Sequence, residues 1–361
     1  MNATVAVGRL AGLTWFASGI FLEKPLFLAW SIVCFALVTS PREVWHRLGR
    51  LRFEFATLLG LLAWQTAAGG TLNALVLLMY LLGLTCGLLL PDPRHITRIY
   101  WLPWIICVAL VTLAYQDESL TRWGLLPAES AFGSNLDEYA IDPRSLSYAL
   151  LILLFYLSPH FGRPASAAMQ QIIMALAALI GSNKFGIAFS LMKNLPRALV
   201  APLLIALVAG LGVVGYAHVE MTAARAALWS DFAANFPHCD RFLGVCTDLI
   251  LSNNEEGVRS FHSLALDFAW YGGPPGMAAA LVFIWRAATV HSLFGRSAGL
   301  LFALSLLFGF PPFFNERHVL ACYAFLVLFQ EGSAARLACR PLREDRAASG
   351  RGGGPGVVRV G

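Results

Sequence analysis

Residues 71–90 read TLNALVLLMYLLGLTCGLLL and contain no charged side chain. An α-helix rises 1.5 Å per residue, so a run of about twenty apolar residues spans the roughly 30 Å hydrocarbon core of a bilayer. Gly83 and Gly87 form a G-x-x-x-G spacing, which favours close packing between helices in lipid. This stretch therefore predicts a membrane-spanning helix that packs closely against a neighbour.

Comparable apolar segments recur along most of the chain. Of its 361 residues, 58% are hydrophobic and 13% are charged, whereas soluble domains carry about 25% charged residues. So few charges would not cover a water-facing surface. We therefore expect an all-α polytopic membrane protein with about twelve transmembrane helices in a lipid bilayer. These helices are expected at residues 5–21, 25–40, 53–68, 71–90, 99–115, 145–158, 166–181, 185–195, 198–218, 272–288, 297–310 and 318–330.

Lys and Arg residues favour alternate loops of this plan. With the N-terminus in the cytoplasm, most of them fall in cytoplasmic loops and in the C-terminal tail, while most carboxylates fall outside. Both termini are then cytoplasmic. Two long loops, 116–144 and 219–271, lie on the outer side, and the larger one separates the ninth and tenth helices. We expect residues 1–335 to form a single membrane domain and the Arg- and Gly-rich residues 336–361 to be a disordered basic cytoplasmic tail.

The larger outer loop carries the most polar stretch between apolar segments, from Glu220 to Trp270. Within it, His262 stands just before an apolar segment. A histidine takes up a proton near neutral pH, so it suits the work of a general base. The alternative is an ordinary interfacial histidine that is hydrogen-bonded to backbone or water. The residues alone leave both interpretations open.

Several cations on the predicted outer side are candidates for phosphate recognition, because a guanidinium matches two phosphate oxygens and an ammonium acts as a point charge. They are Lys184, Arg225, Arg241, Arg259 and Arg317. Lys184 lies between two apolar segments, where a charge is expensive and usually functional. Its alternative is a lysine whose ammonium reaches the lipid headgroups. Arg241 and Arg259 also fit an exposed surface, and Glu316-Arg317 also fits a turn at the membrane surface.

Cys239 and Cys246 both lie in the larger outer loop, with six residues between them. If this loop faces an oxidising periplasm, the two cysteines are candidates for a disulfide that pins the loop. Two free thiols are the alternative. The chain has seven cysteines but no C-x-x-C pair, so we expect no zinc site. The acidic loop 116–144 lacks the spacing of a calcium-binding loop, and we expect it to be solvated.

Together these features resemble the family of bacterial O-antigen ligases and O-antigen or exopolysaccharide polymerases. Twelve helices with cytoplasmic ends are that family's usual plan. Three short segments carry the rest of the resemblance: Ser182–Gly186; Arg225 with Trp229, Pro237 and Leu243–Val245; and His262-Ser263 with Leu266, Gly273 and Gly276. Four positions depart from the family's pattern: Lys184 stands for an Arg, Ser263 for an Asn, Tyr271 for a Glu, and Cys246 for a Gly.

The resemblance implies glycan transfer at the outer face of a bacterial inner membrane. The donor is an oligosaccharide on a polyprenyl pyrophosphate. The acceptor is another lipid-linked repeat unit in a polymerase, or lipid A–core in a ligase. His262 is then the general base for the acceptor hydroxyl, and Lys184, Arg225, Arg259 and Arg317 hold the pyrophosphate. No metal, cofactor or nucleic acid is implied, and a chain-length regulator or other assembly protein would be a further partner.

We favour the polymerase over the ligase because Ser263 and Tyr271 depart from the ligase pattern. A transporter or flippase is the alternative from another class. The short segment 185–195 and the break at Gly272–Gly276 are features that broken transporter helices share. A non-catalytic membrane scaffold is a third interpretation, and it predicts that His262 is dispensable.

Overall fold

The computed structural model describes residues 3–21, 25–92, 151–152, 155–156, 172, 174–175, 184–214, 219–236, 261, 263–308 and 316–330. All regular elements in these ranges are helices, which confirms the all-α prediction. The helices are α1 (Ala3–Phe21), α2 (Pro25–Val38), α3 (Pro41–Ala67), α4 (Thr71–Leu89), α8 (Lys184–Met192), α9 (Arg197–Val214), α10 (Val219–Asn235), α11 (Leu264–Thr289), α12 (Ala298–Phe308) and α13 (Glu316–Leu328). Within the same ranges, isolated β-bridges join Ser292 to Gly295 and to Gln330.

Most predicted apolar segments coincide with a described helix, but their boundaries differ. The segment predicted at 53–68 is only the second part of α3, which begins at Pro41. α10 lies within residues 219–271, which are predicted to be a loop without a helix. Outside the described residues lie the loop 116–144, the tail 336–361 and all or most of the predicted segments 99–115, 145–158 and 166–181.

No helix within the described ranges meets the combined requirements of length and apolar content for a candidate membrane span. The prediction of about twelve transmembrane helices is thus not supported by the described helices.

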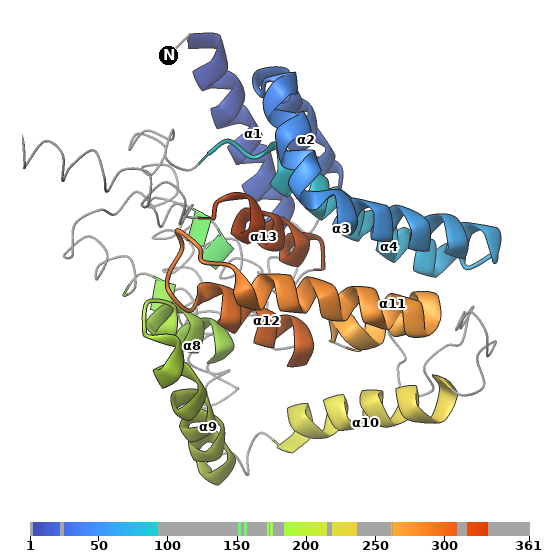
Figure 1. The fold of residues 1–361 in the computed structure, drawn as a ribbon, viewed down its shortest axis with the longest axis vertical. Helices are drawn as coiled ribbons and strands as arrows, with labels where there is room; N and C mark the ends of the chain where they lie inside the picture. Colours follow the sequence, from blue (N-terminus) through green and yellow to red (C-terminus); the bar gives the residue numbers. More distant parts are fainter. Residues whose placement is uncertain are drawn as a thin grey trace, which may run out of the picture.

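The first four helices form two hairpins. α1 packs along α2, and α3 along α4, as Figure 1 shows in blue and cyan. α3 begins where Ser40, with an extended backbone, accepts a hydrogen bond from the Glu43 N–H, and Pro41 occupies the first helical position. It ends at Ala67. Gly69 then adopts a left-handed φ of 79°, which glycine tolerates, and turns the chain into α4.

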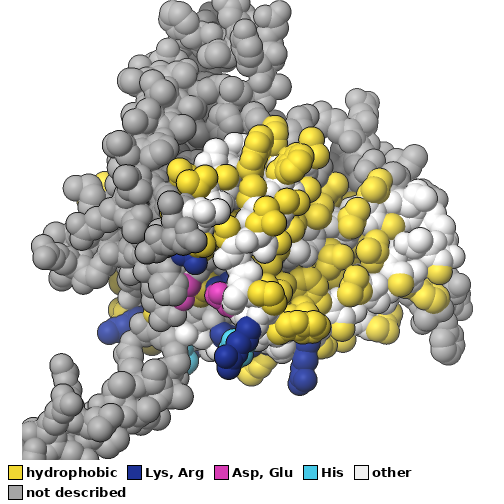
Figure 2. Space-filling view, turned by 90° about the horizontal axis from the view of Figure 1, so that it is seen from above, with side chains coloured by type: hydrophobic (Ala, Val, Ile, Leu, Met, Phe, Trp, Pro, Cys, Tyr) yellow, Lys and Arg dark blue, Asp and Glu magenta, His cyan; other side chains and the backbone are white. Residues whose placement is uncertain are grey.

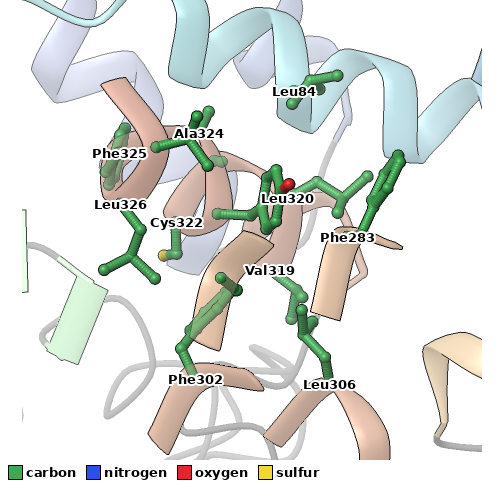
Figure 3. Packing of buried hydrophobic residues seen from close by; sticks show 14 of the residues in the cluster. Leu84, Phe283, Phe302, Leu306, Val319, Leu320, Cys322, Ala324, Phe325 and Leu326 are labelled. Atoms are coloured by element: carbon green, nitrogen blue, oxygen red, sulfur yellow. The ribbon is translucent and has the colours of Figure 1, made fainter. Parts of the chain in front are cut away.

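α13 lies in the hydrophobic core and packs against α3, α4 and α11. Figure 3 shows Leu84 of α4 and Phe283 of α11 beside it. Gly87 lets α4 approach α13 closely, as the G-x-x-x-G spacing predicts. A Cβ atom at this position would lie 2.5 Å from the Ala324 Cβ and 2.8 Å from the Ala321 carbonyl oxygen. Any larger residue at position 87 would therefore push the two helices apart.

Helix α11 is a hairpin of two limbs rather than one straight helix. Gly272 (φ −150°, ψ 21°) and Gly273 (φ 60°, ψ −155°) are non-helical and separate the limbs. The ring centroids of Phe268 and Phe283 lie 5.6 Å apart, whereas the same two positions in a straight helix would be about 22 Å apart. A Cβ atom on Gly276 would lie 2.1 Å from the Phe268 carbonyl oxygen, so the two limbs are in contact. Figure 1 shows them side by side.

At one end of the structure, arginine side chains bind carbonyl groups that the last turns of helices leave unpaired. Arg47 donates to the carbonyl oxygens of Leu88 and Leu90, 3.0 and 2.6 Å away, at the end of α4. Arg50 donates to two carbonyl oxygens at the end of α13. Burial lowers the pKa of the Arg47 guanidinium, while the nearby Glu43 carboxylate raises it. An arginine remains a cation at neutral pH under such shifts, so it also complements the helix dipole.

Arg286, near the end of α11, joins this set. Its Nη2 donates to the Arg50 carbonyl oxygen at 2.7 Å, and its Nε lies 2.8 Å from Glu54 Oε1. The Tyr323 hydroxyl donates to the same carboxylate oxygen. Glu54 Oε2 is buried without a hydrogen-bond partner among the described residues. The Glu54 carboxylate therefore connects α3 to α11 through the ion pair and to α13 through the Tyr323 hydrogen bond. We call Arg47, Arg50, Arg286 and Arg197, which donates to the Val290 carbonyl oxygen at 2.9 Å, the arginine end.

Candidate functional site

Most residues of the predicted site lie outside the described residues. These are His262, Arg241, Arg259, Cys239 and Cys246. The structure describes the backbone, but not the side chains, of Lys184 in α8, Arg225 in α10 and Arg317 in α13. The cysteines among the described residues, Cys34, Cys86 and Cys322, are free thiols. The site is therefore located from its neighbours along the chain.

The backbone is held on both sides of residue 262. On one side, the Phe261 N–H donates to Asp267 Oδ1 at 2.6 Å, and the Phe261 carbonyl oxygen accepts from Trp229 Nε1 at 2.9 Å. On the other side, the Ser263 carbonyl oxygen accepts from the Asp267 N–H at 2.9 Å. Phe261 and Ser263 are both buried, and hydrogen bonds are electrostatically stronger away from water. Position 262 is thus flanked by fixed neighbours.

Asp267 organises this segment from the first turn of α11. It is 3% exposed, and its Oδ2 accepts a long hydrogen bond of 3.4 Å from the Tyr80 hydroxyl of α4. Ser263 has the extended backbone of an N-cap residue (φ −143°, ψ 120°), and the helix dipole favours a carboxylate in the turn that follows. Asp267 therefore connects α4, the start of α11 and the residue that precedes position 262.

A cluster of aromatic rings joins α10 to the same segment. The ring centroid of Phe232 lies 5.0 Å from that of Phe261 and 6.1 Å from that of Trp270. Phe261 and Trp270 lie 5.1 Å apart, and Phe236 stacks on Phe232 at 4.8 Å. Aromatic pairs at such distances stabilise a contact beyond the burial of their area. Together with the Trp229 hydrogen bond, the cluster fixes α10 against the start of α11.

These contacts bring together the backbone elements of two predicted site residues. Position 225 lies four residues, or about one helical turn, before Trp229 on α10, and position 262 directly follows Phe261. Residues four apart share one face of a helix. Position 225 is therefore on the same face of α10 as Trp229, about 6 Å from it along the helix axis.

The other described cations of the predicted site belong to different helices. Lys184 is the first residue of α8, which packs against α12. In Figure 1, α8 and α10 lie well apart. Arg317 is in the first turn of α13, which packs against α4 and α11. Among the described residues, the hydrogen bond and ring contacts that hold α10 do not involve α8.

Asp267 and Tyr80 are not predicted as site residues from the sequence. Asp267 is the only charged residue between Leu264 and Trp285. A lone carboxylate in an apolar segment usually has a function, and this signal could have identified it. Tyr80 lies 187 positions away in the chain, and nothing in its local sequence marks it. Among the residues that the structure describes, no group of three or more His, Cys, Asp or Glu is placed to hold a metal ion.

The chain matches no family model, no curated protein and no solved structure. The resemblance to glycan polymerases and ligases therefore rests on its short motifs.

Proposed function

We propose that this protein is a bacterial inner-membrane glycan polymerase. It joins lipid-linked oligosaccharide repeat units at the periplasmic face and so builds an O-antigen or exopolysaccharide. The observation that supports the proposal is the 2.9 Å hydrogen bond from Trp229 Nε1 to the Phe261 carbonyl oxygen. It couples the helix of Arg225 to the residue before His262. The proposed pyrophosphate-binding cation and the proposed base therefore belong to adjoining elements.

Exposed apolar side chains support the membrane location. Large hydrophobic residues with high exposure include Leu37 (81%), Ile205 (70%), Trp285 (70%), Val7 (65%) and Leu26 (63%). Figure 2 shows hydrophobic side chains over much of one face, with the charged side chains gathered along one side of it. Soluble monomers rarely expose continuous apolar patches larger than a few hundred Å². We propose that a bilayer covers this surface, with about twelve spans and both termini in the cytoplasm.

The proposed reaction begins when a hydroxyl of the acceptor repeat unit attacks the anomeric carbon of the donor. The new carbon–oxygen bond forms as the bond from that carbon to the pyrophosphate oxygen breaks. The His262 imidazole accepts the hydroxyl proton. The polyprenyl pyrophosphate leaves with an additional negative charge, which the Arg225 guanidinium stabilises by binding two oxygens. Lys184, Arg259 and Arg317 are the further pyrophosphate-binding cations that the resemblance implies.

Fixed neighbours suit a general base, because a base acts only within hydrogen-bond reach of the proton it accepts. Small displacements of a catalytic group lower rates by about two orders of magnitude. The hydrogen bonds of Phe261 and Ser263 limit such displacement of the backbone at position 262. They support His262 as the base over an interfacial histidine with no role.

A transporter or flippase is the second candidate function. The broken helix α11 and the buried carboxylate of Glu54, which pairs with Arg286, support it, since transporters use broken helices and buried charges. The pair lies at the arginine end, however, among groups that bind helix ends. We therefore assign it a structural role and favour glycan transfer. A ligase would use the same chemistry as the polymerase, with lipid A–core as the acceptor.

The test is the glycan profile of a strain that lacks the gene for this chain, complemented with variants. Single-repeat capped chains in the deletion strain support the polymerase. Uncapped lipid A–core with accumulated lipid-linked polymer indicates the ligase. Unaltered glycans with a changed uptake of small molecules indicate the transporter.

The His262→Ala variant tests the assignment of the base. We expect it to reach the membrane at the wild-type level and to form no polymer. His291→Ala is the matched control, because His291 is an exposed histidine at the arginine end, and we expect it to restore the profile. Normal polymer from His262→Ala would remove the catalytic assignment.

A further inference from the structure

Helix α3 presents one continuous exposed face over most of its length. Its exposed positions recur from Arg42 to Ala63 at spacings of three and four residues, which is the pattern of a single helix face. The opposite face is buried and includes Leu51 and Leu58. The side chains on this exposed face therefore indicate whether water or lipid surrounds it.

The character of this face changes within a single turn. Up to residue 52 it carries the cations Arg42 and Arg52, with His46 and a Trp45 that is 72% exposed. From residue 53 it carries only apolar and small residues as far as Ala63, including a half-exposed Leu59. A tryptophan beside cations, followed by an uncharged stretch, is the pattern of a helix that passes from lipid headgroups into hydrocarbon.

Gly49 has no side chain, and we call the bare stretch of helix at this position, in the cationic part of the face, the notch. A Cβ atom at this position would meet no other atom within 4 Å. His46 lies one turn before it and Arg52 one turn after it, and both are exposed. The notch is therefore a stretch of bare helix between two groups that can donate hydrogen bonds to an anion.

The neighbouring charges of α3 are already engaged. Glu43 is paired with Arg47, and Arg50 binds the carbonyl groups at the end of α13. Arg42 and Arg52, in contrast, make no hydrogen bond or ion pair within the part of the chain that the structure describes. The available charge on this part of the face is thus positive.

We propose that the notch over Gly49 binds the phosphate of an anionic phospholipid headgroup. His46 and Arg52, each one turn from Gly49, contact its oxygens, and Arg42 adds positive charge two turns before Gly49. Its acyl chains lie along the apolar part of the same face, beginning at Phe53. This apolar continuation favours a lipid over free phosphate. An anionic headgroup is favoured over a zwitterionic one because the latter carries its own cation. The inference rests on the proposed membrane location and not on the proposed glycan transfer.

The test measures how much phosphatidylglycerol the full-length purified protein retains in detergent, with phosphatidylcholine for comparison. Each basic residue near an anionic bilayer surface strengthens binding about fivefold. We expect the Arg42→Gln/Arg52→Gln variant to retain roughly 25-fold less phosphatidylglycerol than the wild type. We expect Gly49→Leu, which fills the notch, to lower retention to a similar extent. Phosphatidylcholine retention should stay unchanged in both variants.

Ala206→Leu is the matched control. Ala206 is a small, exposed residue on α9, away from the proposed lipid site, and the substitution adds the same side chain. Equal loss from Gly49→Leu and Ala206→Leu at equal thermal stability would overturn the proposal, as would wild-type retention by Gly49→Leu and the arginine variant. Full displacement of the lipid by inorganic phosphate would assign the notch to free phosphate instead. No glycan is present in this assay, so its outcome is independent of the polymerase proposal.

Discussion

The backbone N–H of Phe261 donates a 2.6 Å hydrogen bond to the carboxylate of Asp267, six residues further along the chain. This bond closes the segment that carries position 262 onto the first turn of α11. The Asp267 carboxylate thus gives the buried Phe261 N–H a hydrogen-bond acceptor. His262, the proposed base, is therefore connected to α11 through the hydrogen bond of the preceding residue, Phe261.

Asp267→Ala removes that acceptor. An unpaired buried donor costs about 1–3 kcal/mol, so we expect a lower midpoint of thermal unfolding for the purified protein. Glycan transfer in membranes should fall by more than the amount of protein does. Asp267→Asn keeps a carbonyl oxygen at the same position and should retain more of both stability and activity. If the Ala and Asn variants lose both equally, the hydrogen bond is not what Asp267 contributes.

Trp229→Phe keeps most of the aromatic packing but removes the Nε1–H donor to the Phe261 carbonyl oxygen. We expect a loss of about 1 kcal/mol in stability and a clear decrease in polymer formed per unit of protein. Trp285→Phe is the control, because Trp285 is 70% exposed on the second limb of α11. Similar polymer from both variants would indicate that docking of α10 does not matter for transfer.

Glu54→Leu leaves the Arg286 guanidinium and the Tyr323 hydroxyl without their shared acceptor. Removing one partner of a fully buried ion pair costs about 3–5 kcal/mol. The cost here should be smaller, because the Arg286 side chain is 34% exposed and stays partly hydrated. Replacing both partners with apolar groups leaves no unpaired charge. We therefore expect the Glu54→Leu/Arg286→Met double variant to unfold at a higher temperature than Glu54→Leu alone. A double variant that is less stable than both single variants would contradict the structural role. Uptake of small molecules should be unchanged in all three.

Gly273→Ala tests the reversal of α11. The backbone of Gly273 (φ 60°, ψ −155°) lies in a region that is essentially restricted to glycine. We expect a loss of about 1–3 kcal/mol in stability and a loss of glycan transfer, because the first limb carries Asp267. Gly60→Ala is the control, since its helical, open site should gain up to about 1 kcal/mol from the same substitution. Thermal unfolding of the two purified variants decides between these outcomes.

Hydropathy locates the apolar helices well but does not locate the ends of those with polar turns. The apolar pattern around α3 begins near residue 53, whereas the helix begins at Pro41. The intervening helical turns are amphipathic. Their polar residues lower the hydropathy averaged along the sequence, so this part of the helix is not recognised. The signals that mark the true start are local: Ser40 before Pro41, with Glu43 three residues after the cap.

The reversal of α11 is a different case. The Gly272–Gly276 stretch predicts a break, and a break is present at Gly272 and Gly273. That the first limb folds back along the second depends on the contact of Phe268 with Phe283 and on the space that Gly276 leaves. These are tertiary contacts, which cannot be predicted from a local sequence pattern. The segment predicted at 272–288 is accordingly only the second limb.

The candidate site shows the same limit. Sequence motifs identify Arg225, Trp229 and His262, and the backbones of the first two lie on a helix that contacts the residue before the third. The Tyr80–Asp267 contact joins residues 187 positions apart, so only the folded chain brings them together. The roles of His262, Arg225, Lys184, Arg259 and Arg317 and the Cys239–Cys246 disulfide stay predictions.

The arginine end has a consequence for how this chain can be engineered. The guanidinium groups from which the sequence predicts the side of a bilayer also bind the last carbonyl oxygens of α4, α11 and α13. Replacing these arginines with acidic residues, in order to invert the orientation of the helices in a membrane, would also remove the hydrogen bonds to those helix ends. Because the same arginine side chains would set the orientation in a membrane and bind the helix ends, a substitution that changes one would also change the other.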